Sequence, residues 1–159
     1  MAYELNFIIF IIALSILLSI LSFLSKKKQK KEMKKYGLQS PIELRLFKAF
    51  KAKKIDVIPQ YKVKGYRIDL AYFPEGEDSE VKIAIECNGK MYHTLAKDKE
   101  WDKEKNKFLH KDGWRVVRFT GRQIHKDPYK LVNKVIGIAQ GQKRVKKFRK
   151  RQKKYHDTL

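Results

Sequence analysis

The sequence predicts an α/β domain of the order helix, three strands, helix, strand, helix, placed behind an apolar N-terminal helix. Three observations predict this class. Residues 42–50 (IELRLFKAF) carry apolar side chains at helical spacing, residues 66–73 (YRIDLAYF) alternate as a half-buried strand does, and residues 7–24 hold no charge. The 159 residues of the chain are enough for one ordinary domain with appendages.

The uncharged run at residues 7–24 (FIIFIIALSILLSILSFL) is predicted to be a transmembrane helix. As a helix it is about 27 Å long, close to a bilayer core of about 30 Å. A cleaved signal peptide is the rival interpretation, but Glu4 stands where such a leader carries Lys or Arg, and no A-x-A-like site follows. We therefore expect residues 1–25 to be a single-pass anchor. Ser15 and Ser19 are spaced as in a helix-packing face, which leaves a homo-oligomer open, or are merely tolerated.

The net charge of +21 is spread unevenly along the chain. Residues 26–35 (KKKQKKEMKK) carry +6 and belong to an expected juxtamembrane linker, residues 26–37, which the positive-inside bias keeps in the cytoplasm. The expected globular domain, residues 38–140, is also basic. Such a charge favours nucleic acid or an anionic membrane surface as partner. The tail, residues 141–159, is expected to be disordered or a frayed helix, and we favour nucleic acid as its partner.

Three helices are expected in the globular part. Residues 40–43 (SPIE) form a helix start with Ser as N-cap, Pro at the first position and Glu closing a capping box. The Lys-rich segment 97–112 places Trp101 and other apolar residues near helical spacing, and Gly113 is placed to end that helix. Asp127 and Pro128 begin the last helix, which has an apolar stripe.

Four strands are expected between these helices. The first contains Pro59, which confines it to a sheet edge. Lys64 and Gly65 then suit a two-residue hairpin turn. The expected strands are residues 57–63, 66–73, 81–87 and 114–119. Cys87, the single cysteine, reads as a small buried hydrophobic residue at the end of the third strand, which fits a reducing cytoplasm.

The hairpin turn sets the register of the first two strands. A two-residue loop at residues 64–65 puts Gln60 opposite Asp69. If Ile68, Leu70 and Tyr72 share a face with the apolar residues of the third strand, Asp69 and Glu86 share the other face. They are then directly opposed or diagonal, within about 5 to 8 Å of each other. The sequence thus predicts a row of Gln60, Asp69 and Glu86 across three strands.

Two interpretations of this row compete. It is either the solvated face of an antiparallel sheet, or a site where two close carboxylates hold a cation. Ala71 and Ala84 leave room on that face, and polar residues follow Glu86 directly. Carboxylate oxygens suit Mg²⁺, which can activate water while basic side chains hold a nucleic-acid backbone. The second interpretation outlines a nuclease site.

Several motifs in this order resemble a known family. They are SPIE at 40–43, PQY at 59–61, RIDLAY at 67–72, IECNGKMYH at 85–93, Asp102 with Lys105, and GWRVVRF at 113–119. Together they resemble the PD-(D/E)xK nuclease superfamily, and within it the group related to very-short-patch-repair endonucleases, named domain of unknown function 559. The resemblance covers residues 38–137. It implies a restriction-endonuclease-like core, in which the fourth strand runs parallel to its neighbour.

The resemblance implies a function and a set of site residues. The chain is expected to be a membrane-anchored endonuclease that cuts nucleic acid, preferably DNA, with Mg²⁺ or alternatively Mn²⁺. The implied metal ligands are Asp69 and Glu86, helped by the carbonyl of Cys87. The implied catalytic residues are Glu43, Gln60, Asp69, Glu86, Asn88, Lys90 and His93, and the implied nucleic-acid contacts are Lys62, Arg67, Lys105 and Arg118.

One departure from the superfamily motif leaves an alternative. The motif lysine should stand two residues after Glu86, where this chain has Asn88. The charge-stabilising role then falls to Gln60, Lys62, Lys90 or His93. The alternative is a catalytically inactive, membrane-tethered nucleic-acid-binding protein on the same fold. Four residues also have an interpretation without a role in catalysis or binding. Glu43 closes the capping box, and His93 is an ordinary surface residue. Asp102 pairs with a lysine of its own helix, and Arg118 pairs with an acid.

Overall fold

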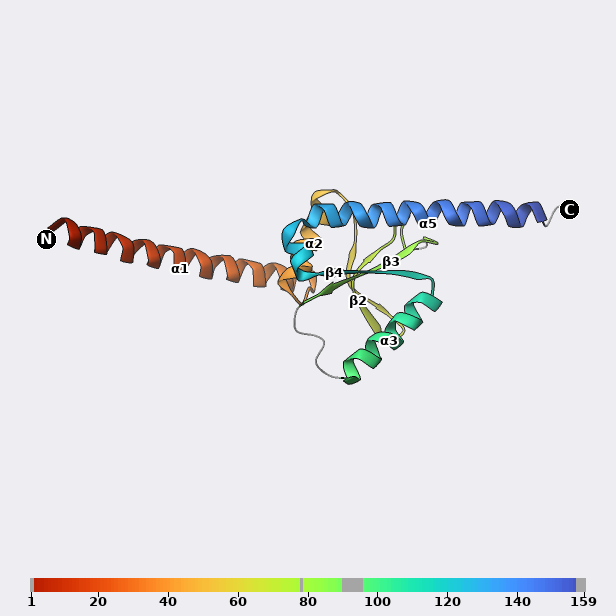
Figure 1. The fold of residues 1–159 in the computed structure, drawn as a ribbon, viewed down its shortest axis with the longest axis horizontal. Coiled ribbons are helices and arrows are strands. Elements are labelled where there is room, and N and C mark those ends of the chain that lie inside the picture. The colour runs from red at the N-terminus through yellow and green to blue at the C-terminus, as the bar shows by residue number, and fades with distance from the viewer. Residues whose placement is uncertain (1, 78, 90–95, 157–159) are drawn as a thin grey trace.

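The computed structural model describes residues 2–77, 79–89 and 96–156. The chain forms the expected order of elements with one addition, a short helix after the last strand (Figure 1). The elements are α1 (Ala2–Tyr36), α2 (Pro41–Ala52), β1 (Ile58–Val63), β2 (Tyr66–Tyr72), β3 (Lys82–Asn88), α3 (Ala96–Lys111), β4 (Trp114–Thr120), α4 (Gly121–Lys126) and α5 (Pro128–His156).

The four strands form one mixed sheet in the order β1-β2-β3-β4. The first three strands pair antiparallel as a meander, and β3 pairs with β4 in parallel. Pro59 lies in the edge strand β1, where proline is tolerated because its missing N–H can face away from the neighbouring strand. Lys64 and Gly65 both have positive φ, 42° and 86°, which is the backbone of a two-residue turn that matches strand twist. The predicted topology and hairpin are confirmed.

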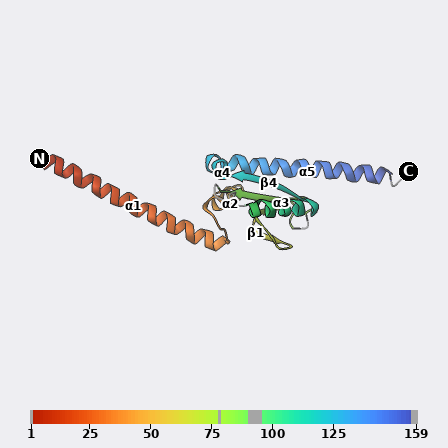
Figure 2. The ribbon, with the colours of Figure 1, turned by 60° about the horizontal axis from the view of Figure 1, so that its bottom comes forward.

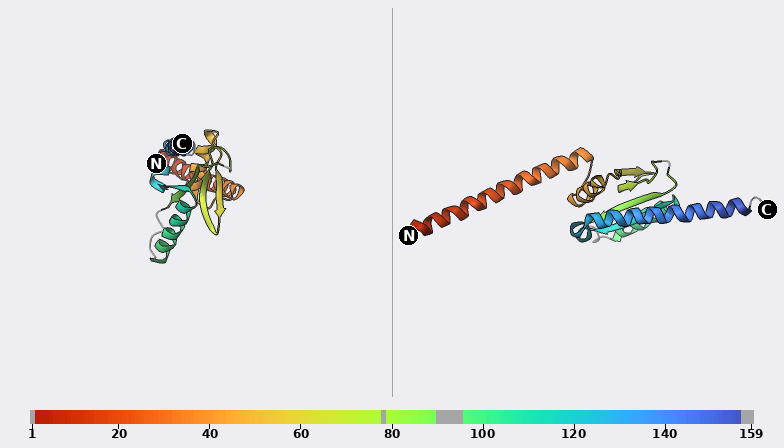
Figure 3. Two further views of the ribbon diagram at one scale, coloured as in Figure 1. Left: turned by 90° about the vertical axis from the view of Figure 1, so that its right-hand side faces the viewer. Right: turned by 90° about the horizontal axis from the view of Figure 1, so that it is seen from above.

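Helices cover both faces of this sheet (Figure 3). On one face α2, α4 and α5 bury the larger core cluster, which includes Phe50, Leu70, Ile85, Phe119 and Val132. On the other face α3 packs over a smaller cluster, which its Leu109 shares with Ile68, Ala71, Ala84 and Trp114. The second face of the sheet is therefore not solvated, and the interpretation that treated it so is wrong.

The alternation of side chains breaks where β1 and β2 face each other. Gln60 has φ of +52°, and the ladder skips from Pro59↔Leu70 to Tyr61↔Ile68. Ile68 consequently packs in the smaller cluster while Leu70 packs in the larger one. The prediction that these two residues share a face is wrong, because one left-handed residue in the partner strand interrupts the regular pleat.

The two terminal helices are longer than the sequence predicts. The basic segment 26–37, expected as a linker, is helical up to Tyr36 within α1, and the basic tail continues α5 without a break to His156. The two helices extend from opposite ends of the domain (Figures 1 and 2). Lys and Arg are good helix formers, so a basic segment can continue a helix that begins before it.

Within the described residues, one helix is long and apolar enough to cross a membrane. It covers Asn6–Tyr36, and none of its most apolar stretch is buried against the rest of the chain. Length and composition thus agree with the predicted anchor.

The short helix α4 was not predicted. Thr120 is its N-cap, and Gln123 returns the bond to the Thr120 backbone, so a complete capping box starts a helix of six residues. Ile124 is its one buried side chain. A segment this short carries too few apolar residues to show a helical period, which is why the pattern missed it.

Candidate active site

Asp69 and Glu86 are the next residues of β2 and β3 after the last paired residues, Leu70↔Ile85. The register of that ladder, continued by one residue, sets them across from each other, which is the first of the two alternatives that the sequence allowed. The backbone N–H of Cys87 donates to Asp69 Oδ2 at 2.7 Å, which holds this carboxylate at the end of β3. Glu86 is buried, with 8% of its surface exposed.

Burial and proximity change how these carboxyls titrate. Burial raises the pKa of Glu86 to about 7, and the negative charge of Asp69 acts in the same direction. Burial likewise raises the pKa of Asp69, although the Cys87 N–H that it accepts opposes the rise. Two close carboxylates in a poorly hydrated place resist carrying two negative charges together, so the pair favours a proton or a cation beside it.

Lys105 of α3 supplies a cation at this place. Its Nζ lies 2.8 Å from Glu86 Oε1, and both side chains are largely buried. Arg118 of β4 is paired in register with Glu86 and donates to Asn106 Oδ1 of α3 at 2.7 Å. Both cations lower the pKa of Glu86 against the effect of burial. The sequence predicted Lys105 and Arg118 as nucleic-acid contacts, and the structure places both beside the carboxylates.

Glu43 is buried at the start of α2 and accepts three hydrogen bonds. Ser40 Oγ donates to Oε1 at 2.6 Å, while the Gln39 N–H and Gln60 Nε2 donate to Oε2 at 3.0 Å and 2.7 Å. Ser40 caps the helix as predicted, but the backbone N–H that donates to the Glu43 carboxylate is that of Gln39, where a capping box would use that of Ser40. Glu43 therefore ties α2 to β1, and Gln60 turns toward it.

One cavity of about 370 Å³ brings most of the predicted residues together. Glu43, Asp69, Glu86 and Asn88 line it, as do the predicted nucleic-acid contacts Arg67 and Lys105. The other lining residues are Gln39, Ser40, Ile42, Cys87, Gly89, Trp101 and Asp102. Gln60 reaches this group through Glu43, and Lys62 lines an adjoining cavity. Lys90 and His93 lie outside the described residues.

Trp101 is a lining residue that the sequence analysis did not single out as part of the site. It lies near helical spacing with other apolar residues of its helix, but its side chain is 57% exposed. Trp114, which packs on the same sheet face, is only 3% exposed. The sequence did hold a signal for this exposure. Lys and acidic residues surround Trp101 from 97 to 107, which is typical of a solvent-exposed segment.

Four carboxylates line the cavity: Glu43, Asp69, Glu86 and Asp102. In the described ranges 2–77, 79–89 and 96–156, no three His, Cys, Asp or Glu side chains are grouped as metal ligands. Burial and the neighbouring carboxylates raise the pKa of the Cys87 thiol, so it stays protonated near neutral pH and is a poor ligand. Asp69 and Glu86 are the side chains of this cavity that could hold a hard cation together.

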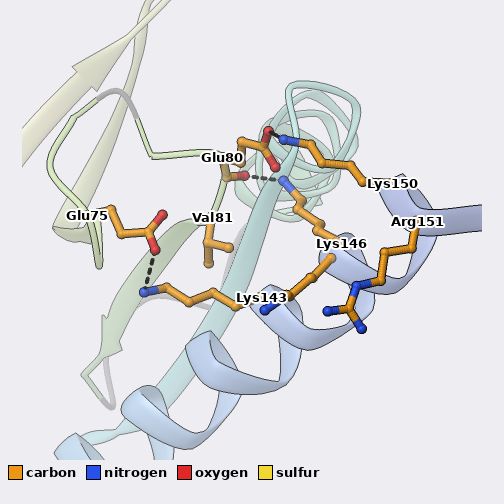
Figure 4. Close-up of a pocket in the computed structure, with 8 residues that line it drawn as sticks. Glu75, Glu80, Val81, Lys143, Lys146, Lys150 and Arg151 are labelled. Carbon is orange, nitrogen blue, oxygen red and sulfur yellow. Dashed lines mark hydrogen bonds and ion pairs between the residues drawn. The ribbon is translucent and has the colours of Figure 1, made fainter. Parts of the chain in front are cut away.

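A second cavity, of about 530 Å³, lies against α5 and is strongly basic (Figure 4). Lys143 Nζ lies 2.9 Å from Glu75, and Lys150 pairs with Glu80, whose backbone carbonyl accepts from Lys146. It shares no lining residue with the carboxylate cavity. The predicted tail is thus helical up to His156, and three of its lysines contact the connection between β2 and β3.

The raised pKa of Glu86 predicts how stability depends on pH. Between its ordinary pKa of 4.5 and about 7, the folded chain holds a proton that the unfolded chain has released. The free energy of unfolding should therefore fall as the pH rises through this window, by up to about 1.4 kcal/mol per pH unit. Chemical denaturation of the detergent-solubilised chain at pH 5, 6, 7 and 8, followed by tryptophan fluorescence, measures this slope.

The matched control is Glu86→Gln, which cannot titrate at this position. Its slope over the same range should be smaller, with the remainder assigned to Asp69 and the four His of the chain. An equal slope in both proteins would show that Glu86 titrates normally.

Comparison with known proteins shows which family this chain belongs to. The family model REase_MTES_1575, which is restriction endonuclease-like, matches residues 43–138. A similar solved structure is the catalytic domain of the homing endonuclease I-Bth0305I, with 20% sequence identity, a TM-score of 0.42, and coverage of 66% of this chain and 92% of that chain. No curated protein matches the chain. Since the family match spans more than half of the residues and includes both carboxylate strands, the chain belongs to the restriction-endonuclease-like family REase_MTES_1575.

Proposed function

We propose that the chain is a membrane-anchored, Mg²⁺-dependent endonuclease that hydrolyses phosphodiester bonds of nucleic acid, with DNA as the preferred substrate. The family match supports a nuclease-like function. The observation that carries the proposal is the close pair of the half-buried Asp69 and the buried Glu86, with Lys105 beside Glu86 in a cavity that both acids line. On the motifs at 67–72 and 85–93, we also infer kinship with very-short-patch-repair endonucleases.

The donor set fits Mg²⁺. This ion is usually held by one or two carboxylates together with waters and substrate phosphate. Burial raises the pKa of both acids, and nearby carboxylates add to the rise, so a cation at this place would favour their charged forms. Asp69 and Glu86 would hold it, with the Cys87 carbonyl as a further donor. Bound there, Mg²⁺ would activate water and neutralise charge on a phosphoryl oxygen; Mn²⁺ could serve the same purpose.

The protein side chains have separate tasks in this mechanism. Among the residues that the structure describes, Lys105 is the one whose ammonium forms an ion pair with Glu86, so it takes the charge-stabilising role that the superfamily gives to the residue at Asn88. Arg67 and Lys62 lie at the rim, where they can hold phosphates on either side of the scissile bond. Glu43 acts as a positioning residue, because its three hydrogen bonds fix α2 and Gln60 beside Asp69.

The anchor determines where this chemistry would happen. We infer that residues 7–24 of α1 cross the membrane and that the Lys cluster at 26–35 holds the rest of the chain in the cytoplasm. The basic face of α5 extends from the end of the domain opposite to α1 (Figure 1). That position supports a nucleic-acid partner for α5 over the lipid surface near the anchor.

A cleavage assay tests the proposal. The full chain in detergent, incubated with supercoiled plasmid DNA, is expected to nick it with Mg²⁺ or Mn²⁺ and to leave it intact with EDTA. The double variant Asp69→Asn/Glu86→Gln, purified in the same way, measures contaminating nuclease. Cleavage that persists in EDTA or in the double variant would contradict the proposal.

One observation favours a second candidate, an inactive nucleic-acid-binding protein. Asn88 stands where the motif lysine belongs, and the neighbouring Lys105 is already engaged with Glu86. Salt-dependent DNA binding without cleavage in any divalent metal would establish this candidate.

A further inference from the structure

An aromatic stack borders the carboxylate cavity. The ring of Trp101 lies 5.3 Å from that of Tyr66, centroid to centroid, and Tyr66 in turn stacks on Phe108 at 5.1 Å with an interplanar angle of 29°. Phe108 is half-buried beneath the smaller core cluster, whereas Trp101 is exposed. The stack therefore runs from the core outward and ends in an exposed indole.

The exposed end of this stack lies where two cavities meet. The adjoining cavity, of about 610 Å³, is lined by Lys62, Gly65, Tyr66, Arg67, Asp69, Trp101 and Lys105. Four of these residues also line the carboxylate cavity: Arg67, Asp69, Trp101 and Lys105. The two cavities are therefore neighbours on either side of these shared residues, and the volume of the adjoining cavity is within the range of sites that hold small organic groups.

The chemistry of this adjoining cavity is aromatic and cationic together. Trp101 offers an exposed ring supported by Tyr66, while Lys62, Arg67 and Lys105 offer positive charge. Proteins that bind single-stranded nucleic acid use this combination, in which bases stack on aromatic rings and basic side chains follow the backbone. A single exposed aromatic residue is common on protein surfaces and does not by itself indicate a binding site. Trp101, however, lines both a basic cavity and the cavity of the carboxylate pair, so it can contact a ligand that carries both an aromatic ring and a phosphate.

We propose that Trp101, supported by Tyr66, forms a stacking site for one unpaired nucleobase next to the scissile phosphate. The inference rests on the proposed function and specifies its substrate class. In an intact duplex both faces of each internal base are covered by neighbouring bases, so a base can reach Trp101 only from a single strand, a loop, a flap or a flipped position. The substrate is therefore nucleic acid that is unpaired at the cleavage site.

Binding without cleavage tests the stacking site. The full chain in detergent is titrated in EDTA with a labelled single-stranded oligonucleotide, its blunt duplex, and the same duplex with a central unpaired bulge. The wild-type chain is expected to bind the single strand and the bulge more tightly than the duplex. Trp101→Ala should weaken binding of the two unpaired substrates about tenfold and binding of the duplex less than twofold.

Two further variants make the result specific. Trp101→Phe keeps a ring face and should restore most of the affinity, while Tyr129→Ala removes an exposed aromatic outside both cavities and should change nothing. Circular dichroism checks that each variant is folded. Equal weakening for duplex and unpaired substrates, or no weakening in Trp101→Ala, would overturn the proposal.

The outcome is separate from that of the cleavage assay. Because EDTA removes metal-dependent hydrolysis, the stacking site can be confirmed in a chain that cuts nothing, and it can fail in a chain that cuts duplex DNA well. A loss of cleavage in Asp69→Asn with unchanged selectivity for unpaired bases would support both proposals.

Discussion

Asp69→Asn is expected to lower the rate of phosphodiester cleavage about 10³-fold while the fold stays intact. The amide oxygen can still accept the Cys87 N–H that Asp69 Oδ2 accepts at 2.7 Å, so the local hydrogen bond survives. The negative charge needed to hold a divalent cation is lost. A bound metal supplies several kcal/mol of charge stabilisation in the transition state, and each 1.36 kcal/mol changes the rate about tenfold.

The measurement for Asp69→Asn has two parts. Single-turnover cleavage of DNA in Mg²⁺ gives the rate, and the shift of the thermal midpoint on adding Mg²⁺ reports metal binding without catalysis. Asp56→Asn is the matched control, because Asp56 is an exposed acid that pairs with Lys51 outside the cavity. A folded Asp69→Asn protein that keeps both the wild-type rate and the Mg²⁺ shift would remove Asp69 from the site.

Lys105→Met is expected to reduce cleavage by about 10² to 10³-fold, the usual loss when one preorganised charge-stabilising group is removed. Methionine keeps much of the apolar length of lysine but removes the ammonium that lies 2.8 Å from Glu86 Oε1. Because Lys105 lowers the pKa of Glu86, that pKa should rise above its present value of about 7. The acid limb of the pH–rate profile should therefore move to higher pH.

This shift separates a catalytic role of Lys105 from a purely structural one. A residue that only stabilises the fold would change the denaturation midpoint without moving the pH profile. Lys105→Arg keeps the charge and should recover part of the rate, and Lys107→Met changes an exposed lysine of the same helix as a control. A Lys105→Met protein with an unmoved pH profile and a near-normal rate would return the charge-stabilising role to Gln60, Lys62, Lys90 or His93.

The carboxylate pair could be predicted because it depends on local rules. A two-residue turn at Lys64 and Gly65 determines one register, and matching the apolar faces of β2 and β3 limits the other to two choices. Neither step needs knowledge of distant contacts. The same rules failed at Ile68, because they assume an unbroken pleat and Gln60 adopts a left-handed backbone.

The surroundings of the pair could not be predicted in the same way. Whether Lys105 reaches Glu86 depends on how α3 docks on the sheet, and Lys-rich helices place many lysines at equivalent spacing. The role of Glu43 shows the same limit, since the capping box accounted for its bond with Ser40 but not for the one from Gln60, 17 residues away.

By itself the sequence determined the order of the elements, the apolar N-terminal helix, the meander with its edge strand, and the adjacency of Asp69 and Glu86. These follow from periodicity, turn chemistry and register, which act between near neighbours along the chain. Only the tertiary structure decided that the second face of the sheet is covered, that Lys105 pairs with Glu86, and that Trp101 remains exposed between two cavities. Those features depend on which face of α3 meets the sheet, and that choice is made by burial summed over distant residues.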